Sequence, residues 1–294
     1  MASNRPQDHR SGNVRTSDGV ELAYDQHGES SKPSIIFLPG WCQTALQWRK
    51  QYEDLGQHFH VTTYDYRGHG SSEKTNRGYR IARFAADLND ILVRLNLNDV
   101  TLVGHSMGCS VMWSFWDIFV TERHRIKSLI LVDQTSCMLP RPGWSEEQAK
   151  EIGTLFTQQS LDEFAIALQS DARATMSQFV PAMFTDKAAK EDVAWTLERN
   201  LMIDSKSAAT LLLDHVKNDW RDVLETINVP TLVVGATGSF CPMSALDYLV
   251  AHIPGARLVA IEKEEGGSHF MFWESPEKFN ALVRRFIGTG EVST

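Results

Sequence analysis

The chain has 294 residues, of which 42% are hydrophobic and 22% charged, so it can bury a large core without cross-links. Its formal net charge of −8, with no block of lysines or arginines, argues against nucleic acid as the main partner. No apolar run reaches the roughly 18 residues of a membrane span. The four cysteines are far apart and lack zinc-binding spacing, which predicts free thiols, no metal site and a cytoplasmic location.

The first part of the chain predicts a tail followed by a hairpin. Residues 1–12 are polar, lack the apolar core of a signal peptide and are expected to form a flexible tail. The next segments, 13–16 and 20–25, flank Ser17-Asp18-Gly19, a typical turn sequence. We therefore expect an antiparallel hairpin at the edge of a sheet.

Short β-rich runs then alternate with helical patterns. The expected strands are Ile35–Leu38, Val61–Asp65, Val100–Gly104, Leu129–Asp133, Thr231–Gly235 and Leu258–Ile261. The clearest helical pattern is Arg77–Asn96, whose apolar residues recur every three or four positions. Strands that alternate with helices predict an α/β fold with a mostly parallel sheet.

The alternation stops between Cys137 and Trp220, where the sequence predicts only helices. They are expected near Glu146–Gln158, Leu161–Met176, Ala188–Met202 and Lys206–Lys217. An insertion after a core strand lies over the carboxyl ends of the strands and can cover a pocket. We therefore expect residues 13–136 and 221–294 to form the core domain and residues 137–220 a helical cap. Most aromatic residues of this segment can be explained by packing between its helices.

Residues Gly104-His-Ser-Met-Gly108 follow a predicted strand and precede a helical segment. This Gly-x-Ser-x-Gly pattern is typical of a sharp turn that exposes a nucleophilic serine, here Ser106. A serine hydroxyl needs a nearby base to react at neutral pH. His269 fits that role, because it lies in a loop after the last predicted strand. His69 and His105 lie inside turns, where a structural hydrogen-bonding role is the simpler interpretation.

With these pieces in place, the chain resembles the α/β-hydrolase superfamily from about Val14 to Ile287. The matching motifs are Leu38-Pro-Gly-Trp-Cys42, Tyr64-Asp-Tyr-Arg-Gly-His-Gly70, the serine pentad and Ser268-His-Phe-Met-Phe-Trp-Glu-Ser-Pro-Glu277. The motifs are most similar to small serine esterases related to cofactor-free haloperoxidases. The resemblance implies that the backbone N–H groups of Trp41 and Met107 form an oxyanion hole. The family's usual histidine before Gly40 is Pro39 here.

The acid of the expected triad departs from the commonest family pattern. Most members carry an aspartate just beyond the strand that corresponds to Thr231–Gly235, but residues 236–241 contain no carboxylate. The other position used in the superfamily is the end of the strand after the nucleophile helix, which is Asp133 here. We assign Asp133 as the acid that orients His269. The alternatives are that Asp133 only caps a turn, or that Asp247 or Glu262 is the acid.

The resemblance implies a hydrolase that cleaves a carboxylic ester or lactone of a small-to-medium apolar molecule, without a cofactor. The candidate pocket residues are Gln43, His105, Phe156, Trp195, Phe240 and Phe270. One alternative is a cofactor-independent dioxygenase, although Gln43 and Met107 stand where those proteins carry histidines. A C–C bond hydrolase and a non-catalytic ligand-binding receptor of the same fold are the others. An aspartate nucleophile, as in haloalkane dehalogenases and epoxide hydrolases, is absent at position 106. The oligomeric state stays open.

Overall fold

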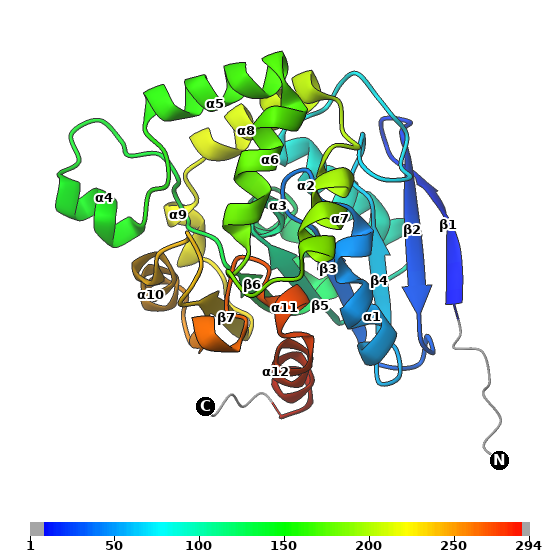
Figure 1. Cartoon of the computed structure of the whole chain (residues 1–294). Coiled ribbons are helices and arrows are strands. Elements are labelled where there is room, and N and C mark those ends of the chain that lie inside the picture. The colour runs from blue at the N-terminus through cyan, green and yellow to red at the C-terminus, as the bar shows by residue number, and fades with distance from the viewer. Residues whose placement is uncertain (1–8, 290–294) are drawn as a thin grey trace.

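The computed structural model describes residues 9–289, which form one eight-stranded sheet flanked by helices (Figure 1). The strand order is β1-β2-β4-β3-β5-β6-β7-β8, in which β1 pairs with β2 and β2 with β4 in antiparallel fashion and the remaining pairs are parallel. The strands are β1 (His9–Arg15), β2 (Glu21–His27), β3 (Ser34–Leu38), β4 (His60–Tyr64), β5 (Val100–His105), β6 (Ile126–Val132), β7 (Thr231–Ala236) and β8 (Arg257–Ile261).

The predicted edge hairpin is present, but it starts earlier than expected. Residues 9–12, which we had assigned to a flexible tail, belong to β1 and pair with residues 24–27 of β2. The imidazole of His9 lies 3.0 Å from the Asp25 carboxylate and stacks on the ring of His27. These cross-strand contacts join polar side chains, so the hydrophobic pattern of the sequence could not reveal the strand. The rest of the predicted tail, residues 1–8, lies outside the described residues.

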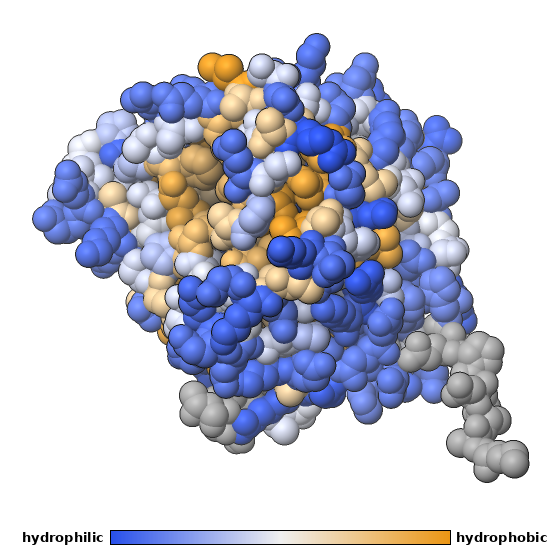
Figure 2. Space-filling model, in the orientation of Figure 1, coloured by the Kyte–Doolittle hydropathy of each residue, from blue (hydrophilic) through white to orange (hydrophobic). Residues whose placement is uncertain are grey.

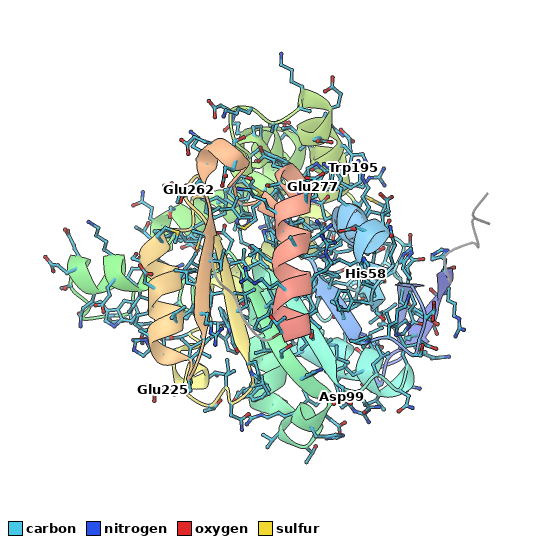
Figure 3. The ribbon with its side chains drawn as sticks, turned by 90° about the horizontal axis from the view of Figure 1, so that it is seen from below. His58, Asp99, Trp195, Glu225, Glu262 and Glu277 are labelled. Carbon is cyan, nitrogen blue, oxygen red and sulfur yellow. The ribbon has the colours of Figure 1, made fainter. Side chains whose placement is uncertain are left out.

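The six predicted parallel strands are confirmed to within a few residues. Every residue of β5 and β7 is buried, as expected for strands that helices cover on both faces. Figure 3 shows the direction of the strands: Asp99 and Glu225, which precede β5 and β7, lie at one end of the sheet, and Glu262, which follows β8, lies at the other. The carboxyl ends of the parallel strands therefore share one edge.

Helices of the core pack in two groups. In one group α1 packs against α12, and in the other α3 packs against both α2 and α9. They are α1 (Arg49–Leu55), α2 (Ile81–Arg94), α3 (Met107–Ile118), α9 (Arg221–Leu224), α10 (Met243–His252), α11 (Met271–Glu274) and α12 (Pro276–Thr289). Short 3-10 turns are η1 (Ala45–Trp48), η2 (Val120–Arg125), η3 (Val180–Met183) and η4 (Lys263–Glu265). Helix α2 buries the predicted apolar stripe but begins at Ile81, because Gly78 has a positive φ of 85° and Arg80 is extended.

Between β6 and β7, residues 137–220 contain five α-helices, and we call this segment the insertion. Its helices are α4 (Glu146–Ile152), α5 (Gln158–Ser170), α6 (Ala172–Phe179), α7 (Lys190–Asn200) and α8 (Ser205–Lys217). The first is shorter than predicted, since Gly153 ends it in a left-handed conformation with φ of 74°. The predicted helix over 161–176 is two helices, because Asp171 interrupts the first and caps the second by accepting the Ala174 N–H at 2.9 Å.

The insertion is attached to the core at several points. Its two ends meet in a bridge between Cys137 and Asp219. The indole N–H of Trp41, in the loop after β3, donates to the carbonyl of Ala208 in α8 at 3.0 Å. Helices α5 and α6 lie beyond the carboxyl edge of the sheet in Figure 1. Within residues 9–289, no helix is long and apolar enough to cross a membrane.

Candidate active site

The turn between β5 and α3 presents Ser106 in a strained conformation. Ser106 has φ of 52° and ψ of −120°, and its N–H donates to the Val132 carbonyl at 2.9 Å. A Cβ at Gly104 would lie 2.4 Å from the Met112 sulfur, and one at Gly108 would lie 2.5 Å from the Leu38 carbonyl oxygen. Both glycines are therefore needed for the close approach of α3 to the sheet, as the pentad predicts.

Three of the five non-glycine residues with positive φ in residues 9–289 lie at the same edge of the sheet. Three non-glycine residues with positive φ follow neighbouring parallel strands: Cys42 (60°) after β3, Ser106 (52°) after β5 and Asp133 (55°) after β6. Such conformations cost about 1–3 kcal/mol each and are common at functional sites, where the surrounding structure holds them in place. Ligand sites of open α/β sheets also lie at this edge.

His269 and Asp133 form a buried pair. The His269 Nδ1 lies 2.6 Å from Oδ2 of Asp133, and neither residue is more than 2% exposed. Burial lowers the pKa of His269, so its imidazole stays neutral at neutral pH. Burial also raises the pKa of Asp133. The hydroxyl of Ser239 donates to the same carboxylate oxygen, Oδ2, and this hydrogen bond lowers the pKa of Asp133. Asp247 lies exposed on α10, and Glu262 accepts instead from Thr237, so His269 has Asp133 as its carboxylate partner.

Ser239 was missed by sequence reasoning. It lies in the loop after β7, the segment in which most family members carry the acid and this chain has none. Its hydroxyl accepts the Cys241 N–H at 3.1 Å and donates to Asp133. The loop after β7 thereby holds in place the carboxylate that follows the neighbouring strand, β6. The missing acid at this position was the signal that another polar residue there could support Asp133.

We expect Ser239→Ala to lower kcat for an ester substrate about tenfold, because a hydrogen bond to a charged group contributes about 1.5–3 kcal/mol. KM should change little, since Ser239 is not among the residues that line the cavity described below. Steady-state kinetics on the wild type and the variant check this. Ser244→Ala, which removes a hydroxyl from the neighbouring helix α10, is the matched control. A kcat equal to that of the wild type would mean that Ser239 does not support Asp133.

A cavity of about 300 Å³ lies between the carboxyl edge of the sheet and the helical insertion. Ser106 and His269 both line it. No hydrogen bond joins the Ser106 hydroxyl to His269 in the part of the chain that the structure describes; such bonds are often long without substrate. The other wall residues are Trp41, Gln43, Gln134, Met138, Leu155, Phe156, Phe179, Ala182, Met183, Leu212, His215 and Phe240.

The wall is mostly apolar, and hydrophobic residues gather in the middle of the face that carries the insertion (Figure 2). Phe240 is 41% exposed while its ring lies 4.4 Å from that of His269 and 6.3 Å from that of Phe179. Phe240 therefore lies between solvent and His269. This arrangement suits the apolar body of a small ligand.

Two backbone N–H groups are available beside Ser106. Met107 is the first residue of α3, so its N–H has no acceptor within the helix, and the helix dipole favours negative charge at this end. The N–H of Trp41 is free of any hydrogen bond with the described residues. The indole bond to Ala208 fixes Trp41 in the cavity wall. These are the two donors that the resemblance implies for an oxyanion hole.

Of the six candidate pocket residues, Gln43, Phe156 and Phe240 lie in the cavity wall, and the other three do not. Trp195 stacks on Trp273 at a ring distance of 4.8 Å. Phe270 is fully buried behind His269 and packs against Phe184. Trp195 and Phe270 are therefore not among the described wall residues, because aromatic neighbours from other elements cover their rings.

His105 is also outside the wall. It links the loop after β3, which carries Gln43, to the loop that carries His269. Its Nδ1 lies 3.1 Å from Oε1 of Gln43, and its Nε2 lies 2.8 Å from the carbonyl oxygen of His269. Gln43 in turn accepts the Gly40 N–H at 3.0 Å. Burial and the nearby His269 hold the pKa of His105 well below its usual range. These contacts agree with the structural interpretation of the turn that contains His105.

Comparison with known proteins identifies the family. The alpha/beta hydrolase fold family matches residues 33–276, so the chain belongs to this family and is an enzyme of the α/β-hydrolase class, as its motifs predict. It is 29% identical to a non-heme chloroperoxidase, CPO-A1, of Kitasatospora aureofaciens over 92% of this chain and 98% of that protein. It is 28% identical to the AB hydrolase superfamily protein YisY of Bacillus subtilis, over 93% and 97% of the two chains.

The fold is also similar to that of an esterase from Exiguobacterium antarcticum. The TM-score is 0.85 at 22% identity, over 95% of this chain and all of that one (100%). These likenesses confirm the α/β-hydrolase fold and the membership of the α/β-hydrolase superfamily that the motifs predict.

Proposed function

We propose that this enzyme hydrolyses carboxylic esters or lactones of small, largely apolar molecules through an acyl-enzyme on Ser106. The observation that carries the proposal is the strained Ser106 facing the same cavity as His269, whose other ring nitrogen is bound to Asp133. Serine, histidine and aspartate in this relation activate a nucleophile on many folds. The esterase and chloroperoxidase likenesses support the same chemistry.

In the proposed mechanism the Ser106 oxygen attacks the carbonyl carbon while His269 takes the hydroxyl proton. Asp133 holds His269 in the required tautomer and stabilises the imidazolium. The N–H groups of Met107 and Trp41 bind the oxyanion. His269 then gives its proton to the departing alcohol oxygen, and water, deprotonated by His269, attacks the acyl-enzyme to release the acid and restore Ser106. No cofactor takes part in this mechanism.

The helical insertion, residues 137–220, acts in this proposal as a cap over the core domain. Phe156, Met183 and Leu212 contribute apolar surface to the cavity, which suits a small-molecule substrate. Hydrolysis of p-nitrophenyl esters from acetate to dodecanoate tests the proposal. We expect a preference for short-to-medium acyl chains, since the cavity of about 300 Å³ is at the small end for ligand sites. Absence of hydrolysis by a folded sample, or equal hydrolysis by Ser106→Ala, would contradict it.

The pH dependence should follow His269. Burial lowers its pKa from the ordinary value of 6.5, so the neutral form that accepts a proton persists to lower pH. We expect kcat/KM for a neutral ester to stay constant from pH 8 to about pH 6.5 and to fall only below that value. A pH profile in buffers of constant ionic strength checks this. A half-maximal rate above pH 6.5 would mean that the base is not a buried, neutral His269.

A further inference from the structure

Two polar residues of the cavity wall have no hydrogen-bond partner. Several buried polar atoms elsewhere also lack partners, but only Gln134 and His215 combine this with a place in the described cavity wall. The other amide of the wall, Gln43, accepts the Gly40 N–H with its Oε1, which also lies 3.1 Å from Nδ1 of His105. An unpaired polar group in an apolar site costs about 1–3 kcal/mol, so two wall residues of one cavity that carry such groups call for an explanation.

His215 belongs to α8 of the insertion and is only 3% exposed. Neither of its ring nitrogens makes a hydrogen bond with the residues that the structure describes. Burial lowers its pKa to about 3, so the ring is neutral at pH 7 and offers one donor and one acceptor. His215 therefore adds hydrogen-bonding capacity to the roof of the cavity without adding charge.

Gln134 follows Asp133 at the end of β6 and is 2% exposed. Its Nε2 is covered by protein and has no partner. Because the amide can flip, the side chain can offer either its two donors or its acceptor to the cavity from the core side. Gln134 and His215 thus come from the core domain and the insertion, the two parts of the chain that enclose the cavity.

We propose that Gln134 and His215 bind a neutral hydrogen-bonding group of the substrate, separate from the carbonyl at which Ser106 reacts. The inference rests on the proposed esterase or lactonase function and narrows its substrate class. The substrate is an uncharged ester or lactone with an apolar body and a second polar function, such as a keto, amide or hydroxyl group. Among residues 9–289, no Lys, Arg, Asp or Glu lines the cavity, so these residues offer no ion-pair partner to a charged substrate group there.

The ratio of kcat/KM for a keto ester to kcat/KM for the matching ester without a keto group tests this inference. We would measure kcat/KM for p-nitrophenyl 4-oxohexanoate and 5-oxohexanoate against p-nitrophenyl hexanoate, which has the same chain length and no keto group. The wild type should prefer at least one keto ester about tenfold or more, the size of one hydrogen bond to a buried group. In Gln134→Leu and His215→Leu the ratio should fall towards one. Met138→Leu, an apolar change in the same wall, should leave the ratio within about twofold of the wild type.

A binding measurement separates this inference from the proposed reaction. Calorimetric titration of Ser106→Ala with methyl 5-oxohexanoate, methyl 4-oxohexanoate and methyl hexanoate reports recognition without turnover. Tighter binding of a keto ester, lost when Gln134→Leu or His215→Leu is added, supports the inference even if the enzyme hydrolyses none of these esters. If hydrolysis occurs but neither keto ester is preferred, or if the preference survives both substitutions, the inference is overturned while the proposed function stands. Should His215→Leu fail to fold, Gln134→Leu alone decides.

Discussion

Asp133→Asn is expected to lower kcat for ester hydrolysis about ten-thousand-fold without unfolding the protein. Asp133 accepts from Nδ1 of His269 at 2.6 Å and so fixes the tautomer whose Nε2 can take the serine proton. The asparagine amide can instead donate to Nδ1, which stabilises the wrong tautomer, and it cannot stabilise the imidazolium. Kinetics with saturating ester, together with thermal melting to verify the fold, measure the effect.

Two matched variants control this experiment. Asp247→Asn removes an exposed carboxylate of α10, and Glu262→Gln removes the one that accepts from Thr237 at 3.0 Å. Both should retain kcat within about twofold of the wild type, as surface changes away from a site usually have small effects. Turnover at the wild-type level in Asp133→Asn, or a large loss in Asp247→Asn, would move the acid elsewhere.

His269→Gln is expected to abolish hydrolysis of every ester, with a loss in kcat of roughly 10⁵–10⁶-fold. Glutamine nearly preserves the volume of the buried side chain but cannot accept the Ser106 proton at neutral pH or return it to the leaving group. Single-turnover measurements with a p-nitrophenyl ester give the acylation rate directly. His124→Gln, in the exposed turn η2, is the control for loss of a histidine as such. Rapid acylation of His269→Gln would show that another group acts as the base.

The core fold could be predicted because its signals are local in sequence. The strands around residues 100–104 and 231–235 consist mainly of Val, Leu and Thr and contain no charged residue, which suits full burial under two layers of helices. β1 lacks such a signal, since His9 and Arg10 face polar partners on one neighbouring strand. Its pairing depends on contacts with β2 that the sequence of residues 9–12 does not encode by itself. The cytoplasmic location stays a prediction.

The candidate site was predictable where a motif fixes the backbone, as at Ser106 with its two glycines. Wall residues were harder, because an aromatic residue on a helix has the same sequence pattern whether it faces a cavity or another helix. Trp195 and Phe156 illustrate the difference. The ring of Trp273 covers Trp195, whereas Phe156 lines the cavity. Gln134, His215 and Ser239 gave no periodic signal, since their importance depends on which atoms lie opposite them in space.

The proposed mechanism requires Ser106 to be an activated nucleophile, which a fluorophosphonate probe and intact-mass spectrometry can detect. We expect one probe molecule per chain, located on Ser106 by peptide mapping, and no adduct in Ser106→Ala. Labelling should slow markedly in His269→Gln, because the base that deprotonates Ser106 is gone. A folded wild-type sample that takes up no probe, or one labelled at another residue, would contradict the account.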